Sequence, residues 1–247
     1  MIASLPMYDW PEVREATDAL WSGLARHLKG LPAIDRRPDY PEVWRRPDLL
    51  ISQTCGYPFT HEFRNELDYI ATPHYAADGC EDSNYCSIIF AREDVPLESF
   101  RNKTAAFNNS DSMSGMLALK LVFAPFARQG RFFATAVRSG GHALSLQSVR
   151  DREADVCAID AVCVALARRY RPDCLDGLVE IARSPRVPGL PFVTRAGDVD
   201  ALRKALADCF ADPEIAPARQ ALLLSGLSVL DPKAYDRILD LEMTMEQ

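Results

Sequence analysis

A serine-rich stretch in the middle of the chain, Asn109-Ser110-Asp111-Ser112-Met113-Ser114-Gly115, joins a predicted strand to a predicted helix. The first turn of a helix leaves N–H groups without partners and carries roughly half a positive charge. Serine hydroxyls placed there can donate to an anion, and Gly115 lets the backbone approach closely. The alternative is ordinary N-capping, in which these polar side chains satisfy the helix's own amides. The stretch therefore predicts either an oxyanion site, centred on Ser112 and Ser114, or a plain helix cap.

Two further strand-to-helix junctions carry polar groups. In Ser139-Gly140-Gly141-His142, the histidine could donate to an oxyanion, with a charge that titrates near neutrality. A capping or packing histidine is the alternative. Asp160 directly follows the predicted strand Asp155–Ile159, where a carboxylate can pair with a ligand amine or cap the next helix.

Polar and aromatic side chains also follow the first two predicted strands. Ligands of open α/β sheets commonly lie against loops at the carboxyl ends of strands. The residues that we expect to line a cleft in this way are Tyr8, Gln53, Thr54 and Tyr57.

Motifs of catalysis and of cofactor binding are absent from the sequence. It has no Gly-x-Ser-x-Gly elbow, no Gly-x-Gly-x-x-Gly, and no Gly-Lys-Ser/Thr after the serine-rich stretch. Ser112, His142 and Asp160 do not follow the chain order of an α/β-hydrolase triad. We therefore expect a protein without enzymatic activity and without a cofactor.

The seven cysteines include no Cys-x-x-Cys pair, and only four histidines occur, so a metal site is not expected. Their odd number leaves at least one thiol free in any monomer. Cys80 and Cys86 bracket a turn-like stretch, so in an oxidising compartment they could form a local disulfide or could remain free.

Composition and charge narrow the class of partner. The chain has 247 residues, of which 48% are hydrophobic and 26% charged, as in an ordinary globular protein. A net charge of −7 argues against nucleic acid or an acidic membrane surface as partner, although a small anion can still bind in a cleft. No stretch approaches the ~20 apolar residues of a membrane span. The first seven residues do not form a signal peptide, so we expect a periplasmic or extracytoplasmic protein if a leader was removed, and otherwise a cytoplasmic one.

Strand-like and helix-like runs alternate, which predicts the α/β class with mainly parallel sheets. Predicted strands are Ile2–Leu5, Leu49–Ser52, Asp68–Thr72, Cys86–Ala91, Ala105–Asn108, Phe132–Arg138, Asp155–Ile159, Gly177–Arg183 and Phe192–Thr194. Helices are predicted from Pro11 to Leu28 and over Ser114–Arg128, His142–Arg150, Ala161–Arg169, Val199–Ala211, Ala216–Leu224 and Pro232–Leu241.

Two βα series of similar size, the second followed only by helices, predict two lobes joined by two crossing segments. We place lobe 1 at residues 1–91 plus 195–247 and lobe 2 at residues 92–194. The crossings are expected near 86–96 and 183–195, with the C-terminal helices returning to lobe 1.

Four segments together resemble the phosphate/phosphite/phosphonate-type solute-binding proteins of ABC importers. They are Ile51-Ser52-Gln53-Thr54-Cys55-Gly56, Asp111-Ser112-Met113-Ser114-Gly115, Gly140-Gly141-His142 and Ser184-Pro185-x-x-Pro188-Gly189-x-Pro191. Their order and spacing match the family over essentially the whole chain. The resemblance implies the type II periplasmic binding protein fold, a small anionic solute and an ABC permease as partner.

The resemblance also implies roles for individual residues. Ser112, Ser114 and the following amides, including that of Gly115, would bind phosphoryl or phosphonyl oxygens, with His142 as a further donor. Asp160 would meet the rest of the ligand. Met113 stands where the phosphonate binders carry a hydroxyl, and Cys55 where they place a cleft aromatic.

Three functions remain open on the sequence. The first is a solute-binding protein that holds a small oxyanion without chemistry. The second is an enzyme of the same architecture, similar to those of the menaquinone pathway. The third is a cytoplasmic sensor or binding protein for another small solute.

Overall fold

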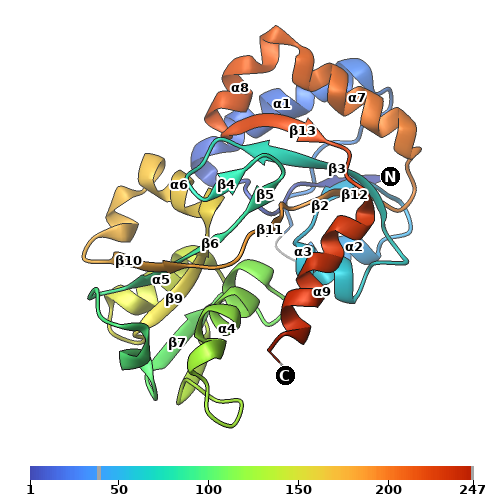
Figure 1. Cartoon of the computed structure of the whole chain (residues 1–247). Coiled ribbons are helices and arrows are strands. Elements are labelled where there is room, and N and C mark those ends of the chain that lie inside the picture. Colours follow the sequence, from blue (N-terminus) through green and yellow to red (C-terminus); the bar gives the residue numbers. More distant parts are fainter. Residues whose placement is uncertain (38–39, 246–247) are drawn as a thin grey trace. The chain divides into compact units, whose positions relative to one another are not determined.

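A computed structural model describes residues 1–37 and 40–245, and its chain divides into two compact units (Figure 1). Unit 1 comprises Met1–Ala76, Glu81–Ser83 and Pro188–Tyr235, and unit 2 comprises the remaining segments, Ala77–Cys80, Asn84–Val187 and the chain from Asp236. Short strands lie where the chain passes between the units: β4 (Cys80–Glu81), β5 (Asn84–Tyr85) and β11 (Val187–Pro188).

Unit 1 is built on a five-stranded sheet with the order β1-β2-β12-β3-β13. The first two strands pair in parallel, while β12 and β13 pair antiparallel with their neighbours. Most of these residues are buried, as expected for strands covered on both faces. The strands are β1 (Ile2–Ser4), β2 (Leu49–Gln53), β3 (Asp68–Tyr75), β12 (Phe192–Thr194) and β13 (Leu224–Ser228).

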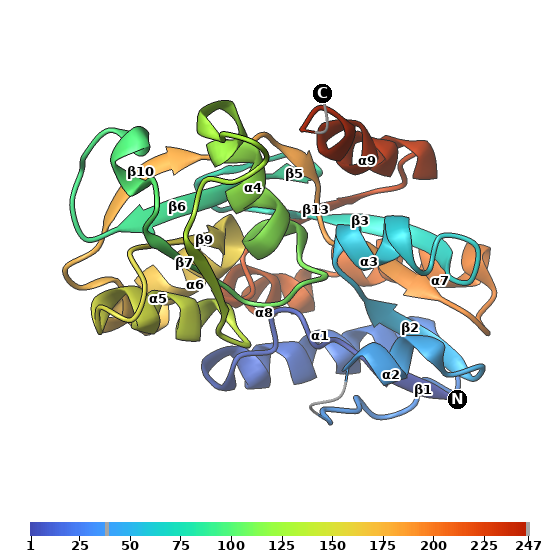
Figure 2. The same cartoon turned by 90° about the horizontal axis from the view of Figure 1, so that it is seen from below.

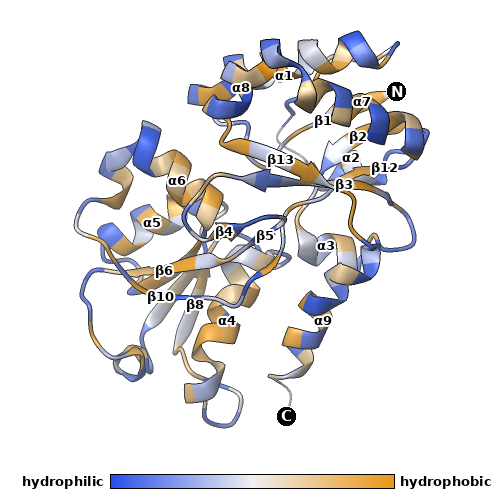
Figure 3. Ribbon diagram, turned by 45° about the horizontal axis from the view of Figure 1, so that its top comes forward, coloured by the Kyte–Doolittle hydropathy of each residue, from blue (hydrophilic) through white to orange (hydrophobic). Residues whose placement is uncertain are grey.

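Helix α1 packs against both α7 and α8 in this unit. Hydrophobic and hydrophilic residues alternate around these helices, which gives each one a face that can be buried (Figure 3). Asp198 caps α7 by accepting from the amides of Asp200 and Ala201, which explains why that helix begins where the sequence predicts. The helices are α1 (Arg14–His27), α2 (Tyr40–Arg45), α3 (Gly56–His61), α7 (Val199–Ala211) and α8 (Ala216–Ala221).

Unit 2 is built on a second five-stranded sheet, with the order β10-β6-β9-β7-β8. Strand β7 pairs in parallel with β8 and β9, whereas β6 pairs antiparallel with β9 and β10. The strands are β6 (Ser87–Ala91), β7 (Thr104–Phe107), β8 (Thr135–Arg138), β9 (Val156–Asp160) and β10 (Val179–Arg183).

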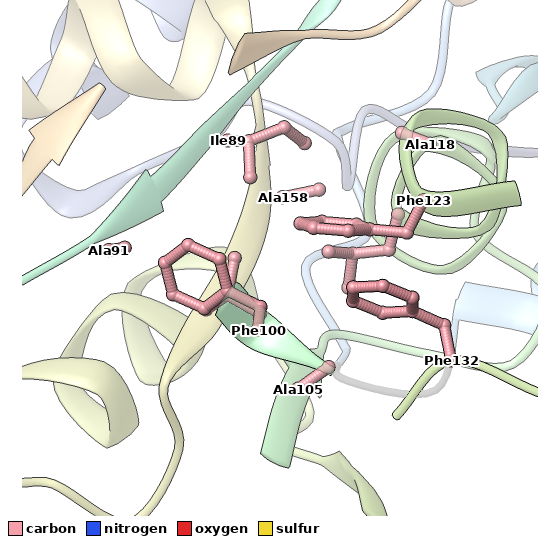
Figure 4. Packing of buried hydrophobic residues seen from close by; sticks show 10 residues of the cluster. Ile89, Ala91, Phe100, Ala105, Ala118, Phe123, Phe132 and Ala158 are labelled. Carbon is pink, nitrogen blue, oxygen red and sulfur yellow. The ribbon is translucent and has the colours of Figure 1, made fainter. Parts of the chain in front are cut away.

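Helices cover both faces of this sheet, with α4 on one side and α5 and α6 on the other (Figure 2). On the α4 side, Phe100, Phe123 and Phe132 pack with Ile89 and small residues of the strands (Figure 4). The Phe123 and Phe132 rings stack with centroids 4.9 Å apart. This core includes residues of β7 and β9, the strands that end at the serine-rich stretch and at Asp160. The helices are α4 (Ala118–Phe123), α5 (His142–Arg150), α6 (Ala161–Tyr170) and α9 (Asp236–Met243).

Short helical turns complete both units. They are 3-10 helices η1 (Pro11–Val13), η2 (Leu97–Phe100), η4 (Ala124–Phe126), η5 (Pro172–Leu175), η6 (Pro213–Ile215) and η7 (Pro232–Tyr235), and the π-helix η3 (Met113–Leu117).

The structure corrects several predicted elements. The prediction of mainly parallel sheets is wrong, because β12, β13, β6 and β10 run antiparallel to neighbours. The region after Phe192–Thr194 is not all helical, since α8 ends at Ala221 and β13 follows it. The connector 36–47 contains α2, and the predicted turn after β2 contains α3; Pro38 and Asp39 lie outside the described residues. Helix 114–128 is instead η3, α4 and η4 in succession.

The unit boundaries also differ from the predicted lobes. Ser87–Ala91 belongs to unit 2, because β6 hydrogen-bonds to β9 and β10. The chain passes between the units over residues 76–84, at Val187/Pro188, and again at Tyr235/Asp236. Helices α7 and α8 therefore belong to unit 1, while α9 is assigned to unit 2.

None of the seven cysteines forms a disulfide in the structure, so Cys80 and Cys86 do not form the bond that the sequence left open. Of the helices within residues 1–37 and 40–245, none combines the length and the apolar character needed to cross a membrane.

Candidate functional site

The serine-rich stretch forms a π-helical turn at the carboxyl end of β7. Ser112 caps this turn: its Oγ accepts a hydrogen bond from the Gly115 amide at 2.9 Å, and its carbonyl accepts from the Leu117 amide at 3.0 Å. A hydroxyl that accepts in this way still has its own hydrogen to donate. The Ser112 and Ser114 hydroxyl oxygens lie 3.5 Å apart, at the outer limit of a hydrogen bond. Capping and anion binding are therefore compatible in Ser112.

Gly115 is required by a close approach of Asn108, the residue that follows β7. A Cβ at position 115 would lie 1.8 Å from Asn108 Oδ1. The Asn108 carbonyl in turn accepts from the Gly140 amide at 2.9 Å, so this residue joins the serine turn to the turn before α5. Gly140 has φ +90°, a conformation that favours glycine. The two turns are thus held in one fixed arrangement.

His142 is the first residue of α5 and contacts the serine turn directly. Its Nε2 lies 3.0 Å from the Ser114 hydroxyl oxygen. Burial lowers the pKa of His142 to about 4, and the nearby Ala158 carbonyl opposes this only in part. The imidazole is therefore neutral at pH 7, and the prediction that its charge titrates near neutrality is wrong.

A neutral imidazole can either donate to or accept from Ser114. When Nε2 carries the hydrogen, it donates to Ser114 Oγ and leaves the serine hydrogen free for a ligand. Among the described residues, Nδ1 has no hydrogen-bond partner of ordinary geometry. No carboxylate of the described chain is hydrogen-bonded to Nδ1 to orient the ring, as in a serine hydrolase.

Asp160 acts as the N-cap of α6. Its Oδ1 accepts from the amides of Val162 at 2.7 Å and Cys163 at 3.3 Å, and the residue is only 2% exposed. The capping alternative is therefore what the structure displays for this residue. The Met113 side chain is also buried, so only its backbone is placed to meet a ligand.

In unit 1, two of the predicted cleft residues lie around one hollow. Tyr8 and Gln53 line it together with Tyr75, the last residue of β3. Tyr75 packs edge-on against Tyr8 with ring centroids 5.1 Å apart, and its hydroxyl accepts from Gln53 Nε2 at 3.1 Å. The second amide hydrogen of Gln53 goes to the Leu190 carbonyl, also at 3.1 Å.

Thr54 and Tyr57 do not line this hollow. Thr54 is fully buried and its hydroxyl donates to the Cys55 carbonyl at 3.3 Å. The Tyr57 ring stacks on that of His61 with centroids 3.7 Å apart, within the short helix α3.

Three residues that shape the serine turn and the unit 1 hollow were not predicted from the sequence. They are Asn108, Tyr75 and Asp9. The first two stand at strand ends, and this position was the available signal. Asp9 was passed over because it adjoins Tyr8 with no motif around it.

Comparison with known proteins decides the family. A family model for the ABC transporter, phosphonate, periplasmic substrate-binding protein matches residues 4–232. The chain belongs to this family. Its type II periplasmic binding protein fold is shared with solved structures. A comparison with curated proteins gave no match.

Three solved structures illustrate the likeness. A binding protein component of an ABC phosphonate transporter from Pseudomonas aeruginosa is 18% identical with TM-score 0.79, covering 99% of this chain and 86% of that one. PhnD1 from Prochlorococcus marinus, in complex with methylphosphonate, is 13% identical with TM-score 0.79, covering 99% and 98%. XAC2383 from Xanthomonas citri, bound to chloride ion, is 19% identical with TM-score 0.75, covering 100% and 97%.

Membership of a substrate-binding family of ABC transporters implies a small solute and a permease partner for this chain. Within this phosphonate-binding family, unit 2 of the present chain carries the Ser112–Ser114–His142 cluster described above.

Proposed function

We propose that this family member binds a small oxyanion, such as phosphate, phosphite or a phosphonate, on the serine turn of unit 2 and does not transform it. The observation that carries the proposal is the contact of Ser114 with His142, next to a Ser112 hydroxyl that already accepts from Gly115. Both serines would direct hydroxyl hydrogens to the anion, and amides of the turn would add further donors. Hydrogen bonds to a charged group are stronger than neutral ones.

A neutral site suits this role. With the pKa of His142 lowered to about 4, the imidazole supplies a dipole without a full charge. The oxyanion would be held by oriented hydroxyl and amide dipoles at a helix start, as in other anion sites. Asp160 is outside this proposal, because its Oδ1 is occupied by the α6 amides.

The 3.0 Å contact between Ser114 and His142 also supports a second candidate, a serine nucleophile activated by a base. Two observations count against it. A histidine whose pKa is about 4 is a weak base, and no hydrogen-bonded carboxylate of the described residues orients its Nδ1. Release of product from a phosphonate ester by the purified chain would favour the enzyme over the binding protein.

The same proposal extends to the transport partner and to unit 1. The solute would pass to an ABC permease, with the protein acting outside the cytoplasm, as the family description suggests. PhnD1 in complex with methylphosphonate supports a phosphonate as the solute class. Tyr8 and Gln53, which line the hollow of unit 1, stay predicted ligand contacts, whereas Thr54, which is fully buried, and Tyr57, which stacks on His61, are outside this proposal.

A thermal-shift screen with phosphate, phosphite, methylphosphonate and aminoethylphosphonate tests the function. A ligand present at 100 times its Kd stabilises the folded state by about 2.7 kcal/mol, which raises Tm by several degrees. Ser112→Ala with Ser114→Ala should remove the shift. Ser110→Ala is the matched control, because this serine is exposed and forms no part of the cluster. Absence of a shift with all four anions would overturn the oxyanion assignment.

A further inference from the structure

The hollow of unit 1 has a chemical character of its own. Its volume is about 380 Å³ when space open to solvent is included, of which about 40 Å³ can be occupied by the centre of a water molecule, and all its lining residues belong to unit 1. Leucines such as Leu20 and Leu222 form an apolar wall in its lining, which also includes the polar groups of Tyr8, Gln53 and Tyr75. Asp9 lines the hollow as the one acidic residue of its described lining.

The Asp9 carboxylate is deeply buried, and only half of it is satisfied. Its side chain is 8% exposed, and Oδ2 accepts from Arg36 Nε at 2.5 Å. Oδ1 is buried and has no hydrogen-bond partner among residues 1–37 and 40–245. Arg36 does not reach that oxygen, because its Nη2 donates to Asp18 at 2.5 Å instead. A buried carboxylate oxygen without a donor is costly unless a further N–H or O–H approaches it.

The charges around Asp9 favour a cation on one side only. Arg36 lies between two carboxylates, Asp9 and Asp18, so this cluster of three groups carries a net charge of about −1. Asp9 also lines a second hollow together with Asp35 and three arginines, Arg14, Arg36 and Arg37, so positive charges outnumber the two carboxylates there and disfavour a cation. Of the two hollows that Asp9 lines, the apolar one is therefore the one whose charge favours a cation.

Aromatic rings strengthen the preference for a cation. Tyr8 and Tyr75 meet edge to face at 5.1 Å in the same lining, and a cation within about 6 Å of such a ring is attracted to its face. The leucine wall suits a short carbon chain rather than a hydrated metal ion. We propose that the unit 1 hollow is a binding site for a primary ammonium ion carried on a short apolar chain, with Asp9 Oδ1 as acceptor.

Ligand-observed NMR on the full chain tests this site with propylammonium chloride as the probe. Sodium chloride at equal ionic strength and 1-propanol, which has the same chain without the charge, are measured beside it. We expect saturation transfer to the propyl protons of the cation and weaker transfer to propanol. Asp9→Asn should weaken propylammonium binding by roughly tenfold or more, because a charge-assisted hydrogen bond is lost.

Asp18→Asn is the matched control, because it removes the other ion pair of Arg36 at an exposed carboxylate outside the hollow. It should weaken propylammonium binding far less than Asp9→Asn does, because Asp18 adds only to the surrounding charge and accepts no hydrogen bond from the cation. If Asp9→Asn fails to fold, Leu222→Phe narrows the hollow without touching the Asp9–Arg36 pair and should also abolish binding. Equal binding of propanol, unchanged binding in a folded Asp9→Asn, or no binding to the wild type would each overturn the proposal.

The inference does not rest on the proposed oxyanion site. A parallel titration with inorganic phosphate separates the two: we expect Asp9→Asn to keep phosphate binding, while the Ser112→Ala, Ser114→Ala double variant keeps propylammonium binding.

Discussion

Two strand-to-helix junctions of unit 2 place a polar side chain in the same position and use it differently. After β7, Ser112 caps η3 by accepting from the Gly115 amide. After β9, Asp160 caps α6 by accepting from two amides. A carboxylate can only accept, so its capping bonds occupy Oδ1. A hydroxyl accepts and still has one hydrogen to donate.

The difference separates a structural cap from a candidate binding group. The Ser112 hydrogen and the Ser114–His142 contact are the basis of the binding proposed for the first junction, whereas Asp160 Oδ1 accepts from two amides of α6. Variants of the two junctions should therefore divide cleanly into those that change anion affinity and those that change only stability.

The largest effect is expected from removing both hydroxyls. Ser112→Ala with Ser114→Ala should weaken methylphosphonate binding by roughly 100-fold or more, because hydrogen bonds to a charged group contribute about 1.5–3 kcal/mol each. Isothermal titration calorimetry measures the change, with Ser110→Ala as control. Retention of wild-type affinity by a folded double variant would show that the two junctions do not differ in ligand binding.

The next effect concerns pH. Because the folded-state pKa of His142 is about 4, below its unfolded value, the unfolded chain binds more protons between about pH 4 and 6.5. The titration of His142 leaves stability unchanged above about pH 6.5 and destabilises the folded chain increasingly as pH falls toward 4. This contribution reaches about 3 kcal/mol.

Urea unfolding of the wild type and of His142→Gln across this range measures that contribution. The wild type should lose more stability than the variant on acidification. Equal losses of stability by the wild type and the variant between about pH 6.5 and 4 would show that folding does not lower the pKa of His142.

A third prediction addresses the close approach at the serine turn. Gly115→Ala should destabilise the chain by about 1–3 kcal/mol, because the new Cβ would displace Asn108 Oδ1, 1.8 Å away. Gly141→Ala is the matched control, since it meets nothing within 4 Å and its φ of −175° suits any residue. Equal urea midpoints for the two variants would show that Asn108 can move away from the new Cβ without a loss of stability.

The smallest effect is expected at the second junction. Asp160→Ala should reduce stability by about 1 kcal/mol through loss of the cap, while Asp160→Asn retains an acceptor and loses less. Neither should change methylphosphonate affinity by calorimetry. A fall in affinity as large as that of the serine variants would give Asp160 the ligand role implied by the resemblance.

Much of unit 2 was predictable because its patterns are local. The helix His142–Arg150 matches its prediction, since its periodicity and the preceding glycines define it without help from the rest of the fold. The strand β13 was missed because Leu224–Ser228 pairs with β3, a partner about 150 residues away, and has no strand-like alternation of its own. The prediction of mainly parallel sheets was wrong for the same reason, because the register and direction of a strand depend on neighbours distant in sequence.

The candidate site was also predictable from the sequence only in part. Ser112, Ser114 and His142 could be selected from their positions at strand ends, and the structure brings them together. The lowered pKa of His142 could not be predicted, because it depends on burial beneath residues remote in sequence. The choice between capping and binding at Asp160 likewise required the positions of the α6 amides.

The most direct test of the central claim is a crystal structure of the chain with methylphosphonate. We expect phosphonyl oxygens at hydrogen-bond distance, about 2.5–3.0 Å, from both Ser112 Oγ and Ser114 Oγ, with Ser112 still accepting from the Gly115 amide. Methylphosphonate bound elsewhere, with Ser112 acting only as a helix cap, would contradict it.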